Sequence, residues 1–101
     1  MAVLTINKSN IEEIKKSDKP VLLDFYADWC GPCRMVAPLV EEIASEREDV
    51  VVGKVNVDAE QELAEEFGVF SIPTLVVIKN GEIVHQEAGA RPKGQILALL
   101  D

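Results

Sequence analysis

The chain has 101 residues, which fits one domain spanning 1–101 and leaves little room for a second. Apolar residues make up 48%, enough for a hydrophobic core. With 10 basic and 18 acidic residues the net charge is −8, which argues against nucleic acid and anionic membrane surfaces as partners. No apolar run approaches the roughly 18 residues of a membrane span, and the start does not resemble a signal peptide. We therefore expect a cytoplasmic protein.

The first half of the chain alternates short apolar runs with amphipathic stretches. Residues 3–6 are largely β-branched and predict a strand. Ser9, with a glutamate three residues later, has the spacing of a capping box and predicts the start of a short helix. Residues 21–27 are almost continuously apolar, as in a strand covered on both faces. A helix follows over about 33–46, and Pro38 inside it is expected to bend it.

A third strand and another helix follow at the middle of the chain. Residues 50–57 predict the strand, and Asp58 is a suitable N-cap for a helix that continues through Phe67. Gly68 suits the left-handed position that ends such a helix.

The last third predicts a hairpin and a closing helix. Strands at 75–78 and 83–87 flank Asn80-Gly81, a strong signal for a tight hairpin turn. Pro92 lies near the first turn of a final helix. The predicted order is β-α-β-α-β-α-β-β-α. Because helix-separated strands usually pair in parallel and hairpins are antiparallel, we expect an α/β fold with a mixed sheet and helices on both faces.

The two cysteines, Cys30 and Cys33, lie where the second predicted strand passes into the long predicted helix. Their spacing brings both side chains to one face over a helical turn, close enough for a disulfide. A helix N-terminus stabilises a thiolate, which is the attacking species in thiol chemistry. We therefore expect Cys30 to be the exposed nucleophile and Cys33 the shielded resolving cysteine. Gly31 leaves room for a partner, and Pro32 fixes φ where a missing N–H does no harm.

Two other interpretations of the cysteine pair are weaker. A metal site needs two further soft ligands, and the chain offers only His85 besides the cysteines. A purely structural disulfide that closes so short a loop removes little chain entropy. The pattern therefore favours redox chemistry at the cysteine pair. We also expect no bound cofactor, because no glycine-rich phosphate loop follows a strand.

Asp24 interrupts the most apolar predicted strand, six residues before Cys30. Its apolar neighbours on both sides make exposure to solvent improbable. Burial raises the pKa of a carboxyl group, and buried unpaired carboxylates mark functional sites more often than surface ones. Asp24 is therefore a candidate for the reaction at the cysteine pair.

The segment from Asp24 to Cys33, Asp-Phe-Tyr-Ala-Asp-Trp-Cys-Gly-Pro-Cys, resembles the active-site segment of the thioredoxin family. Ser-Ile-Pro-Thr at 71–74, Lys-Asn-Gly at 79–81 and Ala-Gly-Ala at 88–90 match later landmarks of that family in order and spacing. The resemblance covers nearly the whole chain. It implies the thioredoxin fold, with a central mixed five-stranded sheet flanked by four helices.

The resemblance also implies roles for residues outside the cysteine pair. Asp24 would relay a proton for Cys33, and Lys54 would face that carboxylate. The Ile72–Pro73 bond would be cis, although a trans bond is the default from sequence alone. The backbone beside Pro73 would then pair with an extended substrate segment.

A docking surface for partners is implied around the cysteines. Trp29 directly precedes Cys30 and would shape the rim of the site. The other members of the implied surface are Val57, Ile72, Thr74, Gly89 and Ala90. Two positions depart from the common family pattern: Tyr26 stands where a second tryptophan is frequent, and Phe70 is apolar where a polar or charged residue is frequent.

The resemblance implies a protein-disulfide reductase that works by dithiol–disulfide exchange and is recharged by a thioredoxin reductase. Its partners would be disulfide-containing proteins, and we expect a monomer. Two rivals stay open. One is a thiol oxidase or isomerase, which would show a reduction potential well above that of cytosolic glutathione. The other is a binding module that uses the surface around Trp29 without turnover and would tolerate replacement of both cysteines.

Overall fold

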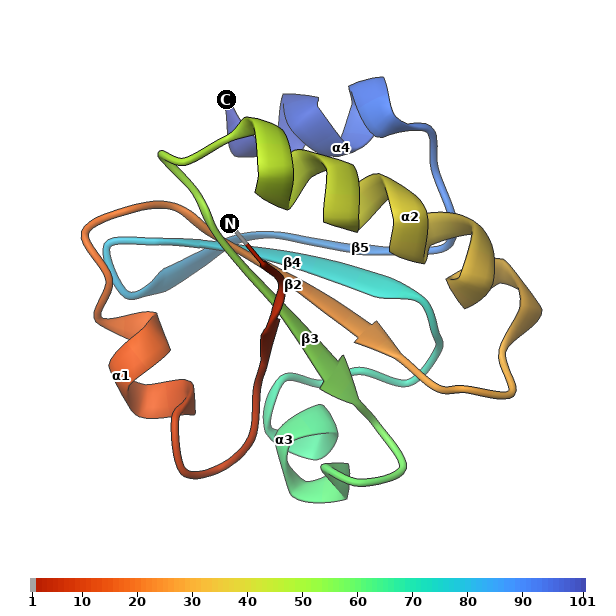
Figure 1. The fold of residues 1–101 in the computed structure, drawn as a ribbon. Coiled ribbons are helices and arrows are strands. Elements are labelled where there is room, and N and C mark those ends of the chain that lie inside the picture. Colours follow the sequence, from red (N-terminus) through yellow and green to blue (C-terminus); the bar gives the residue numbers. More distant parts are fainter. Residues whose placement is uncertain (1) are drawn as a thin grey trace.

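The computed structural model describes residues 2–101, within which five strands and four helices are present (Figure 1). In chain order they are β1 Leu4–Thr5, α1 Ile11–Lys15, β2 Val21–Tyr26, α2 Gly31–Glu46, β3 Val51–Asn56, α3 Gln61–Glu66, β4 Thr74–Lys79, β5 Glu82–Ala88 and α4 Lys93–Leu100. The strands form one mixed sheet in the order β1-β3-β2-β4-β5. This confirms the predicted α/β fold and its element order.

The two faces of the sheet carry separate hydrophobic clusters. α2 and α4 cover one face, and α1 and α3 cover the other (Figure 1). Leu22 of β2 packs with residues of α2 and α4, whereas Leu23 and Phe25 pack with residues of α1 and α3. Because side chains alternate along a strand, Asp24 lies on the same face as Leu22, beneath α2. The most apolar strand thus places one carboxyl group under the long helix.

The direction of β4 differs from the prediction that helix-separated strands pair in parallel. β1, β3 and β2 are parallel, but β4 runs antiparallel to β2. α3 has 6 residues and is about 9 Å long, whereas the 6-residue strand β3 spans about 20 Å, so α3 does not carry the chain back along the sheet. β4 therefore begins at the carboxyl end of β2, with Thr74 opposite Phe25. That places the loop before β4 at the end of the sheet where the cysteines follow β2.

Both predicted side-chain caps are wrong, because neither helix has a side-chain hydrogen bond at its N-cap and asparagine side chains instead hold the turns that precede the helices. Asn7 Oδ1 accepts the backbone N–H of Ser9 and of Asn10, and α1 begins only after Asn10. Asn56 Oδ1 likewise accepts the N–H of Asp58, and α3 begins three residues later. The carboxylate of Asp58 is used elsewhere, as described below.

The turns follow the sequence signals closely. Asn80 and Gly81 have φ values of 54° and 80°, the pair of positive values that a type I′ hairpin turn requires. Gly68, after α3, has φ of 67°, the left-handed value expected there. Pro92 lies at the N-cap of α4. No helix within residues 2–101 has the length and apolar character needed to span a bilayer.

Candidate active site

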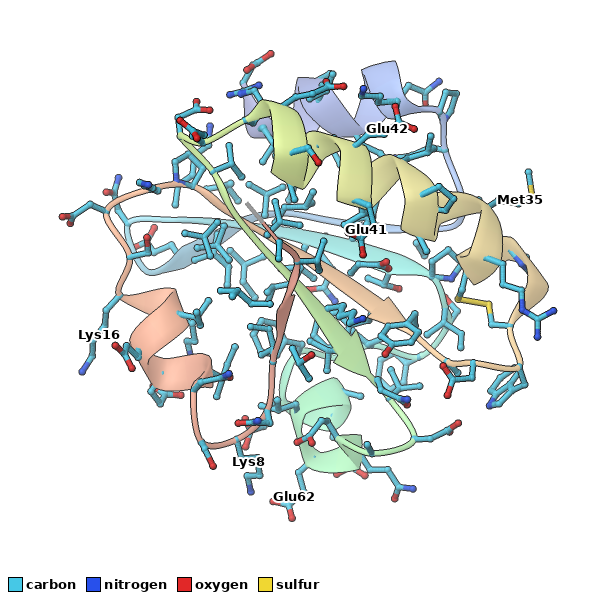
Figure 2. The ribbon with its side chains drawn as sticks, viewed as in Figure 1. Lys8, Lys16, Met35, Glu41, Glu42 and Glu62 are labelled. Carbon is cyan, nitrogen blue, oxygen red and sulfur yellow. A yellow bond between two sulfur atoms is a disulfide. The ribbon has the colours of Figure 1, made fainter. Side chains whose placement is uncertain are left out.

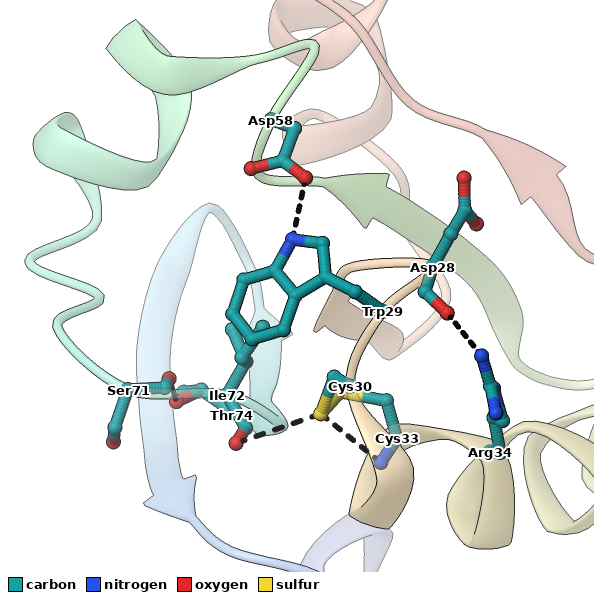
Figure 3. The surroundings of a disulfide bond; sticks show 9 residues. All are labelled: Asp28, Trp29, Cys30, Cys33, Arg34, Asp58, Ser71, Ile72 and Thr74. Atoms are coloured by element: carbon teal, nitrogen blue, oxygen red, sulfur yellow. Dashed lines mark hydrogen bonds between the residues drawn. A yellow bond between two sulfur atoms is a disulfide. The ribbon is translucent and has the colours of Figure 1, made fainter.

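Cys30 and Cys33 are joined by a disulfide at the junction of β2 and α2, with their Cα atoms 5.3 Å apart (Figure 3). Cys30 is the N-cap of α2, and its Sγ accepts the backbone N–H of Cys33 at 3.2 Å. The first N–H groups of a helix have no intrahelical acceptor, and the helix dipole favours negative charge at this end. In the reduced state, this geometry stabilises a thiolate on Cys30. Pro32 lies in the same first turn, where its missing N–H removes no hydrogen bond.

The exposure of Cys30 differs from the prediction. Cys30 is 5% exposed and Cys33 is 3% exposed, so both residues are buried in the disulfide form. They form a small cluster with Ala27, against which Val57 and Ile72 pack. The sequence missed this burial because Ile72 comes from a loop 42 residues away along the chain.

The loop before β4 lies directly against the disulfide. The carbonyl oxygen of Ile72 is 3.9 Å from Cys30 Sγ, and the dashed line in Figure 3 marks this contact. A disulfide sulfur has no proton to donate, so the pair becomes a hydrogen bond only when Cys30 is a protonated thiol. The Ile72–Pro73 peptide bond is cis. The Pro73 carbonyl accepts the N–H of Gly89 at 2.8 Å, which ties this loop to the end of β5.

Thr74 does not have the surface position that a docking residue needs. It is 3% exposed, and its Oγ1 donates a hydrogen bond of 2.6 Å to the carbonyl of Ser71 (Figure 3). It is the first residue of β4, where the sheet buries it. Its role is to hold the loop that presents Ile72 to the disulfide.

Trp29 is 69% exposed beside the disulfide, and its indole N–H donates to Asp58 Oδ2 at 2.8 Å (Figure 3). This bond fixes the direction of a large side chain that the core does not hold. Arg34 donates to the carbonyl of Asp28 at 3.0 Å on the other side of the junction. The sequence predicted Asp58 as a helix cap and did not reveal its contact with Trp29, because the two residues lie 29 positions apart along the chain.

The remaining predicted docking residues differ in their exposure, and of these Val57 and Ile72 pack against the disulfide cluster. Gly89 and Ala90 are exposed, whereas Val57 and Ile72 are half-buried. Gly89 has a φ of 98°, a backbone angle that residues with a Cβ atom rarely adopt.

Asp24 is 3% exposed, and no group among residues 2–101 hydrogen-bonds its Oδ1. Burial raises its pKa to about 7, and the positive charge of Lys54 partly opposes that rise. The sheet register places Asp24 opposite Lys54 on the neighbouring strand β3. Within the described chain, no ion pair shorter than 4.0 Å joins the two groups.

A cavity of about 160 Å³ gives Asp24 its connection to solvent. Lys54 and Glu41 line it together with Asp24, and Figure 2 shows Glu41 projecting from α2 toward the sheet. A buried carboxyl group with a pKa near neutrality and an open cavity beside it can take up and release a proton at physiological pH. In residues 2–101, no group of three or more His, Cys, Asp and Glu side chains is arranged to hold a metal ion.

The fold and the site together define a class of protein. The chain carries a Cys-X-X-Cys disulfide at the start of a helix, on a mixed sheet covered by helices on both faces. This combination is typical of thiol-disulfide oxidoreductases.

Comparison with known proteins identifies the family. The thioredoxin family model matches residues 2–101. The chain is 48% identical over 100 residues to the thioredoxin of Alicyclobacillus acidocaldarius subsp. acidocaldarius, covering 98% of this chain and 95% of the relative. It is 50% identical over 86 residues to the bifunctional thioredoxin reductase/thioredoxin of Mycobacterium leprae, covering 84% of this chain and 19% of that protein. A mutant thioredoxin from Halobacterium salinarum NRC-1 matches with a TM-score of 0.92 at 37% identity, covering 98% and 88% of the two chains. The chain belongs to the thioredoxin family and is a protein-disulfide oxidoreductase.

Proposed function

We propose that Cys30 is the nucleophile and Cys33 the resolving cysteine in the reduction of protein disulfides. The Cys30 thiolate attacks one sulfur of the substrate disulfide, and the other substrate sulfur leaves as a thiolate. The Cys33 thiolate then attacks the Cys30 sulfur, which re-forms the Cys30–Cys33 disulfide and releases the substrate as a dithiol. Two electrons pass from the protein to the substrate. The observation that supports this assignment is the hydrogen bond from the Cys33 N–H to Cys30 Sγ, which favours the thiolate on Cys30.

Asp24 is the proposed proton acceptor for Cys33. A proton must leave the Cys33 thiol before the second attack, and a carboxylate that titrates near pH 7 can accept it and later return it. The cavity beside Asp24 supports this role, because it gives the buried carboxyl group a route for proton exchange. Lys54 is a proposed positioning residue whose charge keeps the pKa of Asp24 from rising further.

The proposed docking site for the substrate is the apolar rim formed by Trp29, Val57, Ile72, Gly89 and Ala90. Ile72 supports a pairing with extended substrate backbone, because its carbonyl lies beside Cys30 Sγ and a strand added there would bring a substrate sulfur to the nucleophile. Apolar side chains at the rim exclude water from the exchanging sulfurs.

A thioredoxin reductase is the proposed electron donor that recharges the oxidised pair. The relative from Mycobacterium leprae, which joins a thioredoxin reductase to a thioredoxin in one chain, supports this partnership. We place the protein in the cytoplasm, because a disulfide reductant works where thiols are kept reduced.

A trapping experiment tests the roles of the two cysteines. A Cys33→Ser variant that attacks a disulfide has no second thiol to resolve the intermediate, so it accumulates a mixed disulfide through Cys30. The matched control, Cys30→Ser, keeps one thiol of the pair and forms no such adduct at an appreciable rate. Mass spectrometry after incubation with a disulfide-containing protein measures both. Equal trapping by the two variants, or trapping by Cys30→Ser alone, contradicts the assignment.

A further inference from the structure

Phe70 is 98% exposed and lies in the loop that leads to the disulfide. It is more exposed than Trp29 at 69% or Met35 at 71%. Its ring belongs to none of the hydrophobic clusters of residues 2–101. Because the core does not use this large aromatic side chain, its whole ring is available to contact another molecule.

The loop that carries Phe70 is held on both sides. The N–H of Val69 donates to the Ala64 carbonyl of α3 at 2.8 Å, and Thr74 Oγ1 donates to the Ser71 carbonyl at 2.6 Å. The backbone on either side of Phe70 is therefore fixed. A ring presented from a fixed loop loses little backbone entropy when it binds.

Phe70 is also close to the reacting sulfur. It precedes Ile72 by two residues, which span at most about 7 Å of backbone. The carbonyl of Ile72 lies 3.9 Å from Cys30 Sγ. A few residues of extended substrate chain cover the same distance, so a side chain near the substrate cysteine can reach the loop that carries Phe70.

The charge around Phe70 narrows the kind of partner. Residues 55–78, which we call the acidic segment, hold five acidic residues and no lysine or arginine, and Lys8 from outside the segment pairs with one of the five, Glu62. An acidic substrate segment would be repelled there, whereas an apolar or basic one would not. Phe70 supplies this segment with a fully exposed aromatic ring.

We propose that Phe70 is a specificity-determining residue that receives a large apolar side chain within a few residues of the substrate cysteine, in a segment that is not acidic. The ring and that side chain exclude water from each other when the substrate cysteine reaches Cys30. The protein therefore selects among disulfide substrates by an apolar residue near the reacting cysteine. This inference rests on the proposed attack by Cys30.

Disulfide-bonded peptides test the proposal. One peptide carries glycine at all positions within three residues of its cysteine, and the others carry a single leucine at one of those positions. The reduced full-length protein is mixed with each peptide, and the fluorescence of its one tryptophan, which lies beside the disulfide, reports oxidation in stopped flow. We expect the best leucine peptide to react about fivefold faster than the glycine peptide, from partial burial of the ring.

Three variants assign that preference to the ring. Phe70→Ser reduces it to less than twofold, whereas Phe70→Leu keeps most of it because the side chain stays apolar. Ile83→Ser, which changes an exposed apolar residue on β5 that is 48% exposed, keeps the wild-type preference. A small disulfide such as bis(2-hydroxyethyl) disulfide is reduced at the same rate by all of them.

An unchanged preference in Phe70→Ser, or an equal loss in Ile83→Ser, overturns the proposal. Failure of the proposed attack by Cys30 has a different signature, because it appears as the absence of a mixed disulfide on Cys33→Ser. The two failures can therefore be told apart.

Discussion

Replacing Asp24 by asparagine removes a buried charge and should stabilise the oxidised protein in a pH-dependent way. The folded state holds the Asp24 proton up to a pH of about 7, its pKa there, whereas the unfolded chain releases it near the ordinary value of 3.8. The folded pKa is the higher of the two, so the unfolded state binds fewer protons between these values. The free energy of unfolding of the wild type therefore falls as the pH rises from about 4 to about 7, and the loss is complete above that range.

The magnitude follows from the size of the pKa difference. The pKa rises by about three units, from 3.8 to about 7, and each unit is worth ~1.4 kcal/mol, so the full penalty is about 4 kcal/mol. About 2.5 kcal/mol of that penalty develops between pH 5 and pH 9. Asparagine does not ionise and keeps a similar shape, so Asp24→Asn avoids this loss.

Urea unfolding of the oxidised wild type and Asp24→Asn at pH 5 and pH 9 measures the effect. The advantage of the variant should grow by about 2.5 kcal/mol between the two pH values. Asp18→Asn, which changes an exposed aspartate between α1 and β2, is the control and should show no such growth. A difference between wild type and Asp24→Asn that stays constant with pH refutes the reasoning, because it would mean that Asp24 titrates alike in the folded and unfolded states.

Three further predictions concern the charge of Lys54, two glycines and the acidic segment. Lys54→Met removes the charge that lowers the pKa of Asp24, so the pH profile for disulfide reduction should shift to higher pH, as steady-state rates would show. Gly53→Ala should destabilise the protein by about 1–3 kcal/mol, because the new Cβ would lie 2.5 Å from the Ile6 side chain. Gly94→Ala should stabilise the protein by up to about 1 kcal/mol, because a Cβ at this position of α4 would meet no other atom. Urea unfolding measures both effects. Raising the salt concentration should slow the reduction of basic disulfide peptides and accelerate that of acidic ones, because salt screens the acidic segment.

The sequence predicted the elements well where local patterns determine them. The apolar run of β2 indicated a strand covered on both faces, and Asn80-Gly81 indicated the hairpin turn. It did not predict the direction of β4, because that depends on whether the helix α3 is long enough to carry the chain back along the sheet. It also assigned side-chain caps to Ser9 and Asp58, because residue types alone do not show that the turns before these helices are held by hydrogen bonds to the side-chain oxygens of Asn7 and Asn56.

The candidate active site was also predictable from the sequence only where neighbouring residues determine it. The position of Cys30 and Cys33 at a strand–helix junction could be derived from neighbouring residues. The burial of Cys30 could not, because the loop at Ile72 covers it from 42 residues away. The Trp29–Asp58 hydrogen bond also joins distant segments, and no pattern within either segment announces it.

The pKa of Asp24 is the result of two opposing effects, and the proposed proton transfer needs both. Burial beneath α2 raises the pKa, and the positive charge of Lys54 on the neighbouring strand lowers it. Without the lysine the pKa of the carboxyl group would be higher, so less of it would be ionised at neutral pH to accept the proton of Cys33. Without burial it would stay ionised and could not hold that proton once accepted. The burial that destabilises the fold at neutral pH is therefore the same burial that suits Asp24 to serve Cys33, which is why a carboxyl group in the most apolar strand is better explained by the reaction than by the fold.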